Sequence, residues 1–236
     1  MPFFYFGASN NFMRYAYVGH ERVEPQKGLR GLCACCGGEL IAKCGHFKIH
    51  HWAHKDLKSC DPWWENESEW HRQWKSHFPP ERQEVVFVSP ATQEKHIADV
   101  YSEKGVILEF QSYAIDVEEV RARENFYQQL VWVINGVKNE FDKFYFAQSI
   151  VGTDPNDSML KNVKWFGRSK LFAKWAQATK QVYFDFGTDI VWHLVRFDSN
   201  SKTGQVRAYE KEKFIQFYGG TSKPILSFQQ SAFGDR

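Results

Sequence analysis

The run HIADVYSEKGVILEFQ, from His96 to Gln111, holds the pattern that indicates the fold. Two strand-like segments, HIADVY and VILEF, are joined by residues 102–105, Ser-Glu-Lys-Gly, a short loop whose terminal glycine suits a hairpin. Asp99 lies in the first strand and Glu109 lies in the second, ten positions later. Because antiparallel neighbours can bring both carboxylates to one end of a sheet, we expect these two to share a divalent cation.

The cost of burying charge supports the same expectation. A carboxylate in an apolar strand is unfavourable unless it is paired or ligates a metal, and two carboxylates on adjacent strands repel each other. Gln111 follows two residues after Glu109, so strand alternation places it on the same face. The pattern is therefore Asp, a hairpin, then Glu-x-Gln. The alternative is a solvent-facing pair at the strand ends.

The segment before the hairpin has a helical period. Two sets of residues recur at intervals of four, first Trp70, Trp74 and Phe78, and then, on a neighbouring face, Glu67, His71 and Lys75. This spacing predicts an amphipathic helix over residues 65–78 that ends at Pro79-Pro80. By spacing alone, the polar set is more typical of a solvated salt-bridge stripe than of a catalytic site.

The segments after this helix complete an α/β pattern. Residues 84–88 (EVVFV) read as a strand before the hairpin, and a helix is predicted from an N-cap at Asp116 to Asn135-Gly136. It should turn inward Val120, Tyr127, Leu130, Val131 and Ile134. A strand is predicted over residues 144–147 (FYFA). Helix, three strands, helix and strand describe a compact α/β core with a mixed sheet and a crossover helix.

The ends of the chain carry weaker signals. Two short strands are expected within residues 1–32, and the runs VYFDF and IVWHLVRF read as strands near the C-terminus. Between residues 161 and 180, basic side chains alternate with aromatic ones and no acidic residue occurs. This stretch is as typical of a cationic amphipathic helix with buried tryptophans as of a base-stacking platform.

All five cysteines and four of the nine histidines fall between Cys33 and Cys60. Thiolate and imidazole are the ligands that zinc prefers, and a C-x-x-C pair followed by histidines can close a tetrahedral site. The expected ligands are Cys33, Cys36, His54 and Cys60, with His51 as a substitute. Enough ligands are present to close the shell, so the zinc is expected to be structural. The alternative is a set of buried, reduced thiols.

Composition limits the compartment and the kind of protein that this chain can be. Cysteines confined to one stretch do not resemble a disulfide framework, which indicates a reduced, intracellular protein. The N-terminus lacks a basic n-region, and no run of about 18 apolar residues occurs, so we expect a soluble, cytoplasmic protein without a membrane span. A formal charge of +2 excludes little, because a phosphate-binding face can be local.

Seven short motifs in order, from Cys33 to Val133, resemble the competence-protein CoiA-like nuclease family of the PD-(D/E)XK superfamily. They are the cysteine pair with CGG, HWAH, Cys60, the Glu67-Ser68-x-x-His71-x-x-x-Lys75 run, IADV, EFQS at Glu109, and Arg123 with Tyr127. The later VYFDFG and FIQFYG runs are also similar to that family. One departure is that the family usually has arginine three residues before the strand aspartate, where this chain has His96.

The resemblance implies a restriction-endonuclease-like core of a mixed sheet flanked by helices, with an N-terminal zinc module. The expected domains are residues 1–64 for the strands and zinc module, 65–152 for the nuclease core and 153–236 for a C-terminal basic helix and strand region. Glu67, Asp99 and Glu109 would hold Mg²⁺ or Mn²⁺, Gln111 would stand where lysine is commoner, and His71 or Lys75 would supply the missing positive charge.

The implied activity is metal-dependent hydrolysis of phosphodiester bonds in DNA, in DNA processing or recombination. The expected DNA-contacting residues are Arg123, Tyr127, Lys164, Arg168 and Lys170, although Arg123 and Tyr127 could instead brace the site. A homo-oligomer or a recombination protein is the expected protein partner. The rivals are a DNA-binding accessory whose catalytic site is degenerate, and a protein that uses its zinc module to dock a partner.

Overall fold

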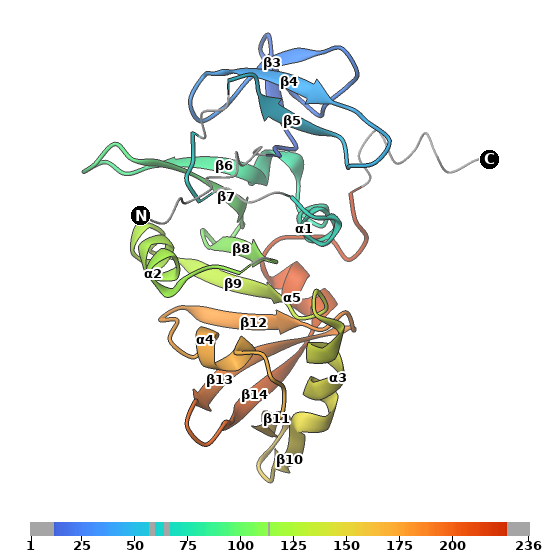
Figure 1. Cartoon of the computed structure of the whole chain (residues 1–236), viewed down its shortest axis with the longest axis vertical. Coiled ribbons are helices and arrows are strands. Elements are labelled where there is room, and N and C mark those ends of the chain that lie inside the picture. Colours follow the sequence, from blue (N-terminus) through green and yellow to red (C-terminus); the bar gives the residue numbers. More distant parts are fainter. Residues whose placement is uncertain (1–11, 57–59, 64–66, 113, 226–236) are drawn as a thin grey trace, which may run out of the picture. The chain divides into compact units, whose positions relative to one another are not determined.

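A computed structural model describes residues 12–56, 60–63, 67–112 and 114–225 of the chain (Figure 1). The chain forms two compact units, and neither is continuous in sequence. The first unit is Met1–Arg72 with Glu84–Ala98, and the second is Gln73–Gln83 with Asp99–Arg236. The structure thus places the metal-ligand stretch in the first unit and both strand carboxylates in the second.

The first unit is built on a small antiparallel sheet with the strand order β2-β1-β3-β4-β5. Its strands are β1 Ala16–Val18, β2 Glu21–Val23, β3 Arg30–Leu32, β4 Glu39–Lys43 and β5 His51–His54. Among the described residues of this unit, a cluster of six buried side chains forms a core, namely Met13, Ala16, Cys33, Cys35, Leu40 and Trp52. A core of this size supplies little hydrophobic stabilisation, so the unit needs further support.

Part of that support comes from later in the chain. Glu84–Val88 of β6 (Gln83–Val88) and Lys95–Ala98 of β7 (Lys95–Tyr101) belong to the first unit. The buried Glu84 carboxylate accepts hydrogen bonds from the backbone N–H groups of Arg14 and Tyr15 at 3.0 to 3.1 Å. Glu84 has a φ of +48°, a left-handed conformation that non-glycine residues rarely adopt. These hydrogen bonds hold that strained residue in place.

The second unit contains most of a larger mixed sheet, with the strand order β10-β11-β14-β13-β12-β9-β8-β7-β6. In chain order after β7, its strands are β8 Ile107–Gln111, β9 Leu130–Asn135, β10 Ile150–Asp154, β11 Asp157–Lys164, β12 Gln181–Asp185, β13 Ile190–Asp198 and β14 Thr203–Glu210. Strands β8, β9 and β12 run parallel, and the other pairings in this unit are antiparallel. The expected mixed α/β fold is therefore confirmed.

Five α-helices accompany the strands in the described part of the chain: α1 Glu69–Lys75, α2 Val117–Phe126, α3 Glu140–Ser149, α4 Leu171–Trp175 and α5 Lys211–Phe217. A short 3₁₀ turn, Pro80–Arg82, begins at the second proline of Pro79-Pro80. The Asp116 side chain caps α2 by accepting the N–H of Glu119, as predicted. Helix α1 is shorter than expected and ends before Pro79; residues 65 and 66 of the predicted segment lie outside the described residues.

Two sequence predictions are wrong. The helix from Asp116 stops at Phe126, and Leu130–Asn135 forms strand β9. That run has no polar alternation because the strand is buried on both faces, which hides the strand signal. Residues 144–147 lie within helix α3, whose buried residues Asp142, Phe146 and Ser149 follow helical spacing. The predicted order of helix, three strands, helix and strand nevertheless holds, with β9 as the last strand.

Asp185, at the end of β12, anchors the second unit. Its carboxylate is 1 % exposed and accepts hydrogen bonds from Trp74 Nε1 at 2.8 Å, Lys211 Nζ at 2.9 Å and the Gly187 backbone N–H at 2.8 Å. Asp185→Ala removes these acceptors and leaves a buried indole N–H without this partner. We expect the variant to lose about 3 kcal/mol of unfolding free energy in urea denaturation.

A matched control separates burial from charge. Glu210 pairs with Lys213 at 2.7 Å, but both side chains are exposed. Glu210→Gln should therefore cost less than about 1 kcal/mol. Equal losses for the two variants would contradict the anchoring role of Asp185.

Candidate functional site

Four side chains of the first unit meet in a metal-ligand group. One ligand atom from each of Cys33, Cys36, His54 and Cys60 lies within 4.8 Å of the other three. The Cys33 and Cys60 sulfurs are 3.6 Å apart, and Cys36 Sγ is 3.3 Å from His54 Nε2. Within the described part of the chain, this is the one group of three or more Cys, His, Asp or Glu side chains arranged to hold a metal ion.

A tight turn presents the first two cysteines. The Cys33 backbone N–H donates to Gly38 O and the Gly37 N–H donates to Cys33 O, both at 2.9 Å, while the Gly38 N–H points at Cys36 Sγ at 3.3 Å. Gly37 has a φ of +71°, which glycine adopts at little cost. A Cβ on Gly38 would lie 3.1 Å from Cys36 Sγ. The Gly-Gly pair thus lets the backbone wrap closely around the sulfur atoms.

The donor set fits zinc. Three thiol sulfurs and one imidazole nitrogen make a Cys₃His group, one of the tetrahedral sets of structural zinc sites. The hydrogen bond between the two thiols lowers the pKa of Cys33 and raises the pKa of Cys60. Cys33 is therefore the thiol that ionises more readily. The group could bind a metal such as zinc.

The remaining candidates in this stretch lie outside the group. His51 Nδ1 is 2.8 Å from Ile49 O, and the ring stacks on Phe12. Burial lowers the pKa of His51, so its imidazole is neutral at physiological pH. Cys35 packs into the core of the first unit, whereas Cys44 is half-buried outside that core. All five cysteines are free thiols.

A buried, hydrogen-bonded carboxylate–imidazole pair lies next to the last cysteine of the group. Asp61 follows Cys60, and its Oδ1 is 2.8 Å from His96 Nδ1, while its Oδ2 accepts the Ile97 N–H at 2.7 Å. His96 is 1 % exposed, and its ring stacks on Trp63. CoiA-like proteins usually have arginine at this position. In this chain, His96 stands there and connects the segment after Cys60 to β7.

In the second unit, Asp99 and Glu109 meet where β7 and β8 separate. The ladder pairs Tyr101 with Ile107 and Val100 with Leu108. At the next step, Asp99 Oδ2 accepts the Phe110 N–H at 2.9 Å, and Glu109 Oε1 accepts the Asp99 N–H at 3.3 Å. Each carboxylate thus accepts a backbone N–H of the opposite strand, in the place of a backbone carbonyl of its own strand.

Cationic side chains approach both carboxylates. Arg123 on α2 donates from Nη1 to Glu109 Oε2 at 3.0 Å and from Nε to Glu119 Oε1 at 3.1 Å, and its guanidinium lies over Trp132. Lys75 Nζ, 1 % exposed, is 3.9 Å from Asp99 Oδ1. Arg123 is buried between carboxylates, which favours bracing over contact with a phosphate.

Two more of the predicted site residues, Gln111 and Tyr127, belong to the second unit. Gln111 is buried at the end of β8, and Tyr127 is the buried C-cap residue of α2. Tyr127 donates its backbone N–H to Arg123 O at 2.9 Å. Tyr127 thus closes the helix that carries Arg123.

The expected third carboxylate belongs to the first unit. Glu67 is buried and accepts from Arg72 Nε at 3.0 Å, and Arg72 also donates to His50 O at 2.9 Å. His71 Nδ1 is 2.8 Å from Ser68 Oγ. Arg72 thus connects the start of α1 to His50, and the buried Glu67, His71 and Lys75 do not form a solvated stripe.

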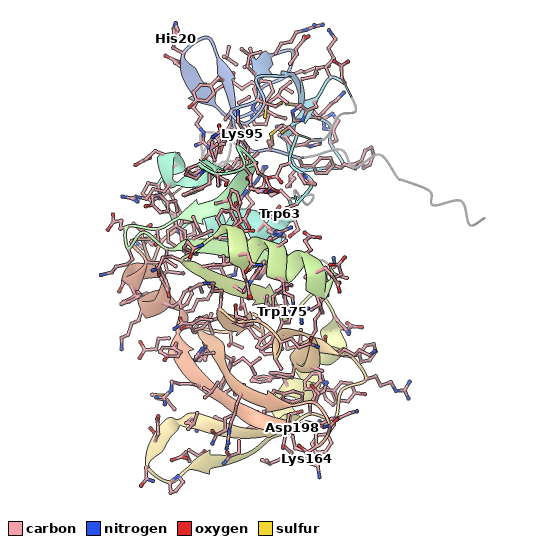
Figure 2. All side chains as sticks on the ribbon, turned by 90° about the vertical axis from the view of Figure 1, so that its left-hand side faces the viewer. His20, Trp63, Lys95, Lys164, Trp175 and Asp198 are labelled. Atoms are coloured by element: carbon pink, nitrogen blue, oxygen red, sulfur yellow. The ribbon has the colours of Figure 1, made fainter. Side chains whose placement is uncertain are left out.

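The basic stretch from Lys161 to Lys180 forms neither of the expected arrangements as a whole. It comprises the end of β11, a loop and the short helix α4. Trp165, Phe172 and Trp175 are buried in the core, whereas Phe166 is exposed. Lys164, Arg168 and Lys170 are exposed, with Lys164 at the periphery and Trp175 inside the second unit (Figure 2). The cations are thus available to an anionic partner.

Sequence patterns missed the buried pairs that connect distant segments. Asp61 with His96, Glu84 with the Arg14 backbone, and Asp185 with Trp74 are separated by 35, 70 and 111 residues. The sequence signal for such a pair is a polar residue between apolar neighbours. It does not identify the partner.

The fold is that of a mixed α/β protein whose N-terminal part carries a Cys₃His group that could bind a metal. Residues 22–62 match the family model described as "Competence protein CoiA, N-terminal domain". This match confirms the resemblance to CoiA proteins over the segment that holds all four ligands. No curated protein and no solved structure gives a significant match. None of the described helices is long and apolar enough to span a bilayer.

Proposed function

We propose that this chain is a metal-dependent nuclease with a PD-(D/E)XK-type core that hydrolyses phosphodiester bonds in DNA, and that the Cys₃His group holds a structural zinc ion. The observation that carries the proposal is the Asp99–Glu109 pair. Each of the two carboxylates accepts a backbone N–H of the other strand where β7 and β8 separate. Lys75 lies beside Asp99.

The donor chemistry of this pair fits a hard cation. Carboxylate oxygens are the ligands that Mg²⁺ and Mn²⁺ prefer, and Asp99, with 18 % of its side chain exposed, is reachable from solvent. Asp99, Glu109 and the backbone carbonyl of Phe110 would hold the cation. A bound cation would neutralise charge on the phosphoryl oxygens and lower the pKa of an attacking water.

The remaining side chains would position the phosphate. The Lys75 ammonium supplies the positive charge that glutamine at position 111 lacks. The Gln111 amide can donate to a phosphate oxygen or orient water. Arg123 holds the Glu109 carboxylate in a fixed orientation through its bond to Oε2.

One observation favours a second candidate, a DNA-binding accessory with a degenerate nuclease site. Arg123 already neutralises Glu109, so a cation would compete with a buried guanidinium for that carboxylate. Under this alternative, exposed cations such as Lys164, Arg168 and Lys170 would bind the DNA backbone without cleavage. A recombination protein or a second copy of the chain is the proposed protein partner in either case.

The deciding experiment is incubation of the zinc-loaded protein with linear, nicked, branched and single-stranded DNA and with RNA, in Mg²⁺ and in Mn²⁺. We expect cleavage of DNA that requires the added cation. Binding without cleavage of any substrate would sink the nuclease proposal and support the accessory. The Lys75→Ala variant tests the role of the lysine, which is wrong if this variant cleaves as fast as the parent protein.

A further inference from the structure

The second unit contains a pocket of about 760 Å³ that none of the groups above explains. It lies where β9 and β12 begin, and α5 contributes several of its lining residues. Five aromatic side chains line it: Tyr183, Tyr209, Phe214, Phe217 and Tyr218. Three lysines, Lys104, Lys180 and Lys213, also line it, and no described lining residue is acidic.

Of the pocket's lining residues on β9 and β12, Val131, Gln181 and Tyr183 lie on the face opposite Glu109, and Leu130, at the start of β9, also lines the pocket. Strand register places Glu109, Trp132 and Val182 in one row across β8, β9 and β12. The neighbouring row contains Val131 and Gln181, which line the pocket. Because successive side chains of a strand point to opposite faces, the pocket and the Asp99–Glu109 pair are separate features.

The lysines are placed to receive an anion. Lys180 Nζ donates to Gln128 O at 3.0 Å, which fixes the ammonium at the pocket and uses one of its three donors. Lys104 Nζ lies 5.1 Å from the centroid of the Phe217 ring. Lys213 pairs with Glu210, but this exposed ion pair contributes little and can be exchanged for a phosphate.

The aromatic side chains provide stacking surfaces. Phe217 is 60 % exposed and Tyr209 is 40 % exposed, whereas Tyr183, Phe214 and Tyr218 form a buried floor. Burial raises the pKa of Tyr183 and Tyr218, so both phenols are neutral and add no negative charge. Exposed rings beside cations match a ligand that has both a planar face and a negative charge.

We propose that this pocket binds a nucleotide, with the base against Phe217 and Tyr209 and the phosphate at Lys104, Lys180 and Lys213. The nucleotide is either a free nucleoside monophosphate or one nucleotide of a single DNA strand. This binding site goes beyond the proposed nuclease activity and does not require it, because no residue of the pocket belongs to the carboxylate pair.

The test measures binding to the full zinc-loaded chain carrying Asp99→Asn, without added Mg²⁺, so that cleavage cannot interfere. Calorimetry is used for deoxynucleoside monophosphates, unphosphorylated nucleosides and inorganic phosphate. Fluorescence anisotropy is used for a short single strand and the matching duplex. We expect a monophosphate or the single strand to bind more tightly than the nucleoside, phosphate or duplex.

Phe217→Ala and the double change Lys180→Ala, Lys213→Ala should each weaken that binding about tenfold. Phe141→Ala and Lys143→Ala on α3, which change exposed residues of the same types outside the pocket, should leave it unchanged. Binding by the monophosphate indicates a free nucleotide, and binding by the strand alone indicates a DNA segment. No binding by either ligand, equal binding by the duplex, or equal affinity in folded pocket variants would overturn the proposal.

Discussion

Cys60→Ser is expected to abolish stoichiometric zinc binding and to unfold the first unit. The change removes one of four candidate ligands from a group that links the turn between β3 and β4, the end of β5 and the segment before α1. Structural zinc sites contribute on the order of 10 kcal/mol of folding free energy, which is comparable to the whole stability of a domain. The small core around Leu40 and Trp52 cannot replace that contribution.

Metal analysis and circular dichroism with a thermal scan measure this effect, with Cys44→Ser as the matched control. Cys44 is a half-buried free thiol outside the ligand group, so its replacement should leave zinc content and unfolding temperature unchanged. Chelation of the parent protein should reproduce the Cys60→Ser result. A chelated protein that stays folded and loses only cleavage would show that the zinc is catalytic.

Asp99→Asn is expected to reduce cation-dependent DNA cleavage by about a thousandfold while the protein stays folded. The amide oxygen of asparagine can still accept the Phe110 N–H, so the strand contact is retained. The negative charge that would hold the cation is lost, and several kcal/mol of transition-state stabilisation correspond to about three orders of magnitude in rate.

Initial cleavage rates in Mg²⁺ and Mn²⁺ measure the loss, and Glu118→Gln is the control. Glu118 is an exposed carboxylate on α2, so its variant should cleave at the parent rate. Glu109→Gln is less informative, because it leaves the buried Arg123 without its full counter-charge and destabilises the fold as well. Undiminished cleavage by Asp99→Asn would place the catalytic site elsewhere.

Short sequence patterns were sufficient to predict the β7–β8 hairpin, the cap of α2 and the members of the Cys₃His group. The hairpin between β7 and β8 follows from its loop, in which Gly105 has a φ of +73° and the Ser102 N–H bonds Val106 O. The Asp116 cap follows from a pattern of four residues. The four residues that spacing favoured as zinc ligands are also the four that the structure brings together.

Other features depended on packing that no short window contains. Leu130–Asn135 resembles a buried helix segment as much as a strand, and its parallel pairing with β8 and β12 decides the matter. The orientation of Arg123 toward Glu109 depends on where α2 crosses the sheet. Side-chain spacing indicates which residues share a face but not which charges satisfy one another.

The division of the first unit into two chain segments has a consequence for its synthesis on the ribosome. The zinc ligands and Asp61 are made before His96, which follows Asp61 by 35 residues. At a translation rate of about 5–20 residues per second, the emerging module spends roughly 2–7 s without its histidine partner. During that interval the proposed zinc ion would be an important support of the nascent module, so we expect the yield of folded protein to rise with the zinc supplied during synthesis.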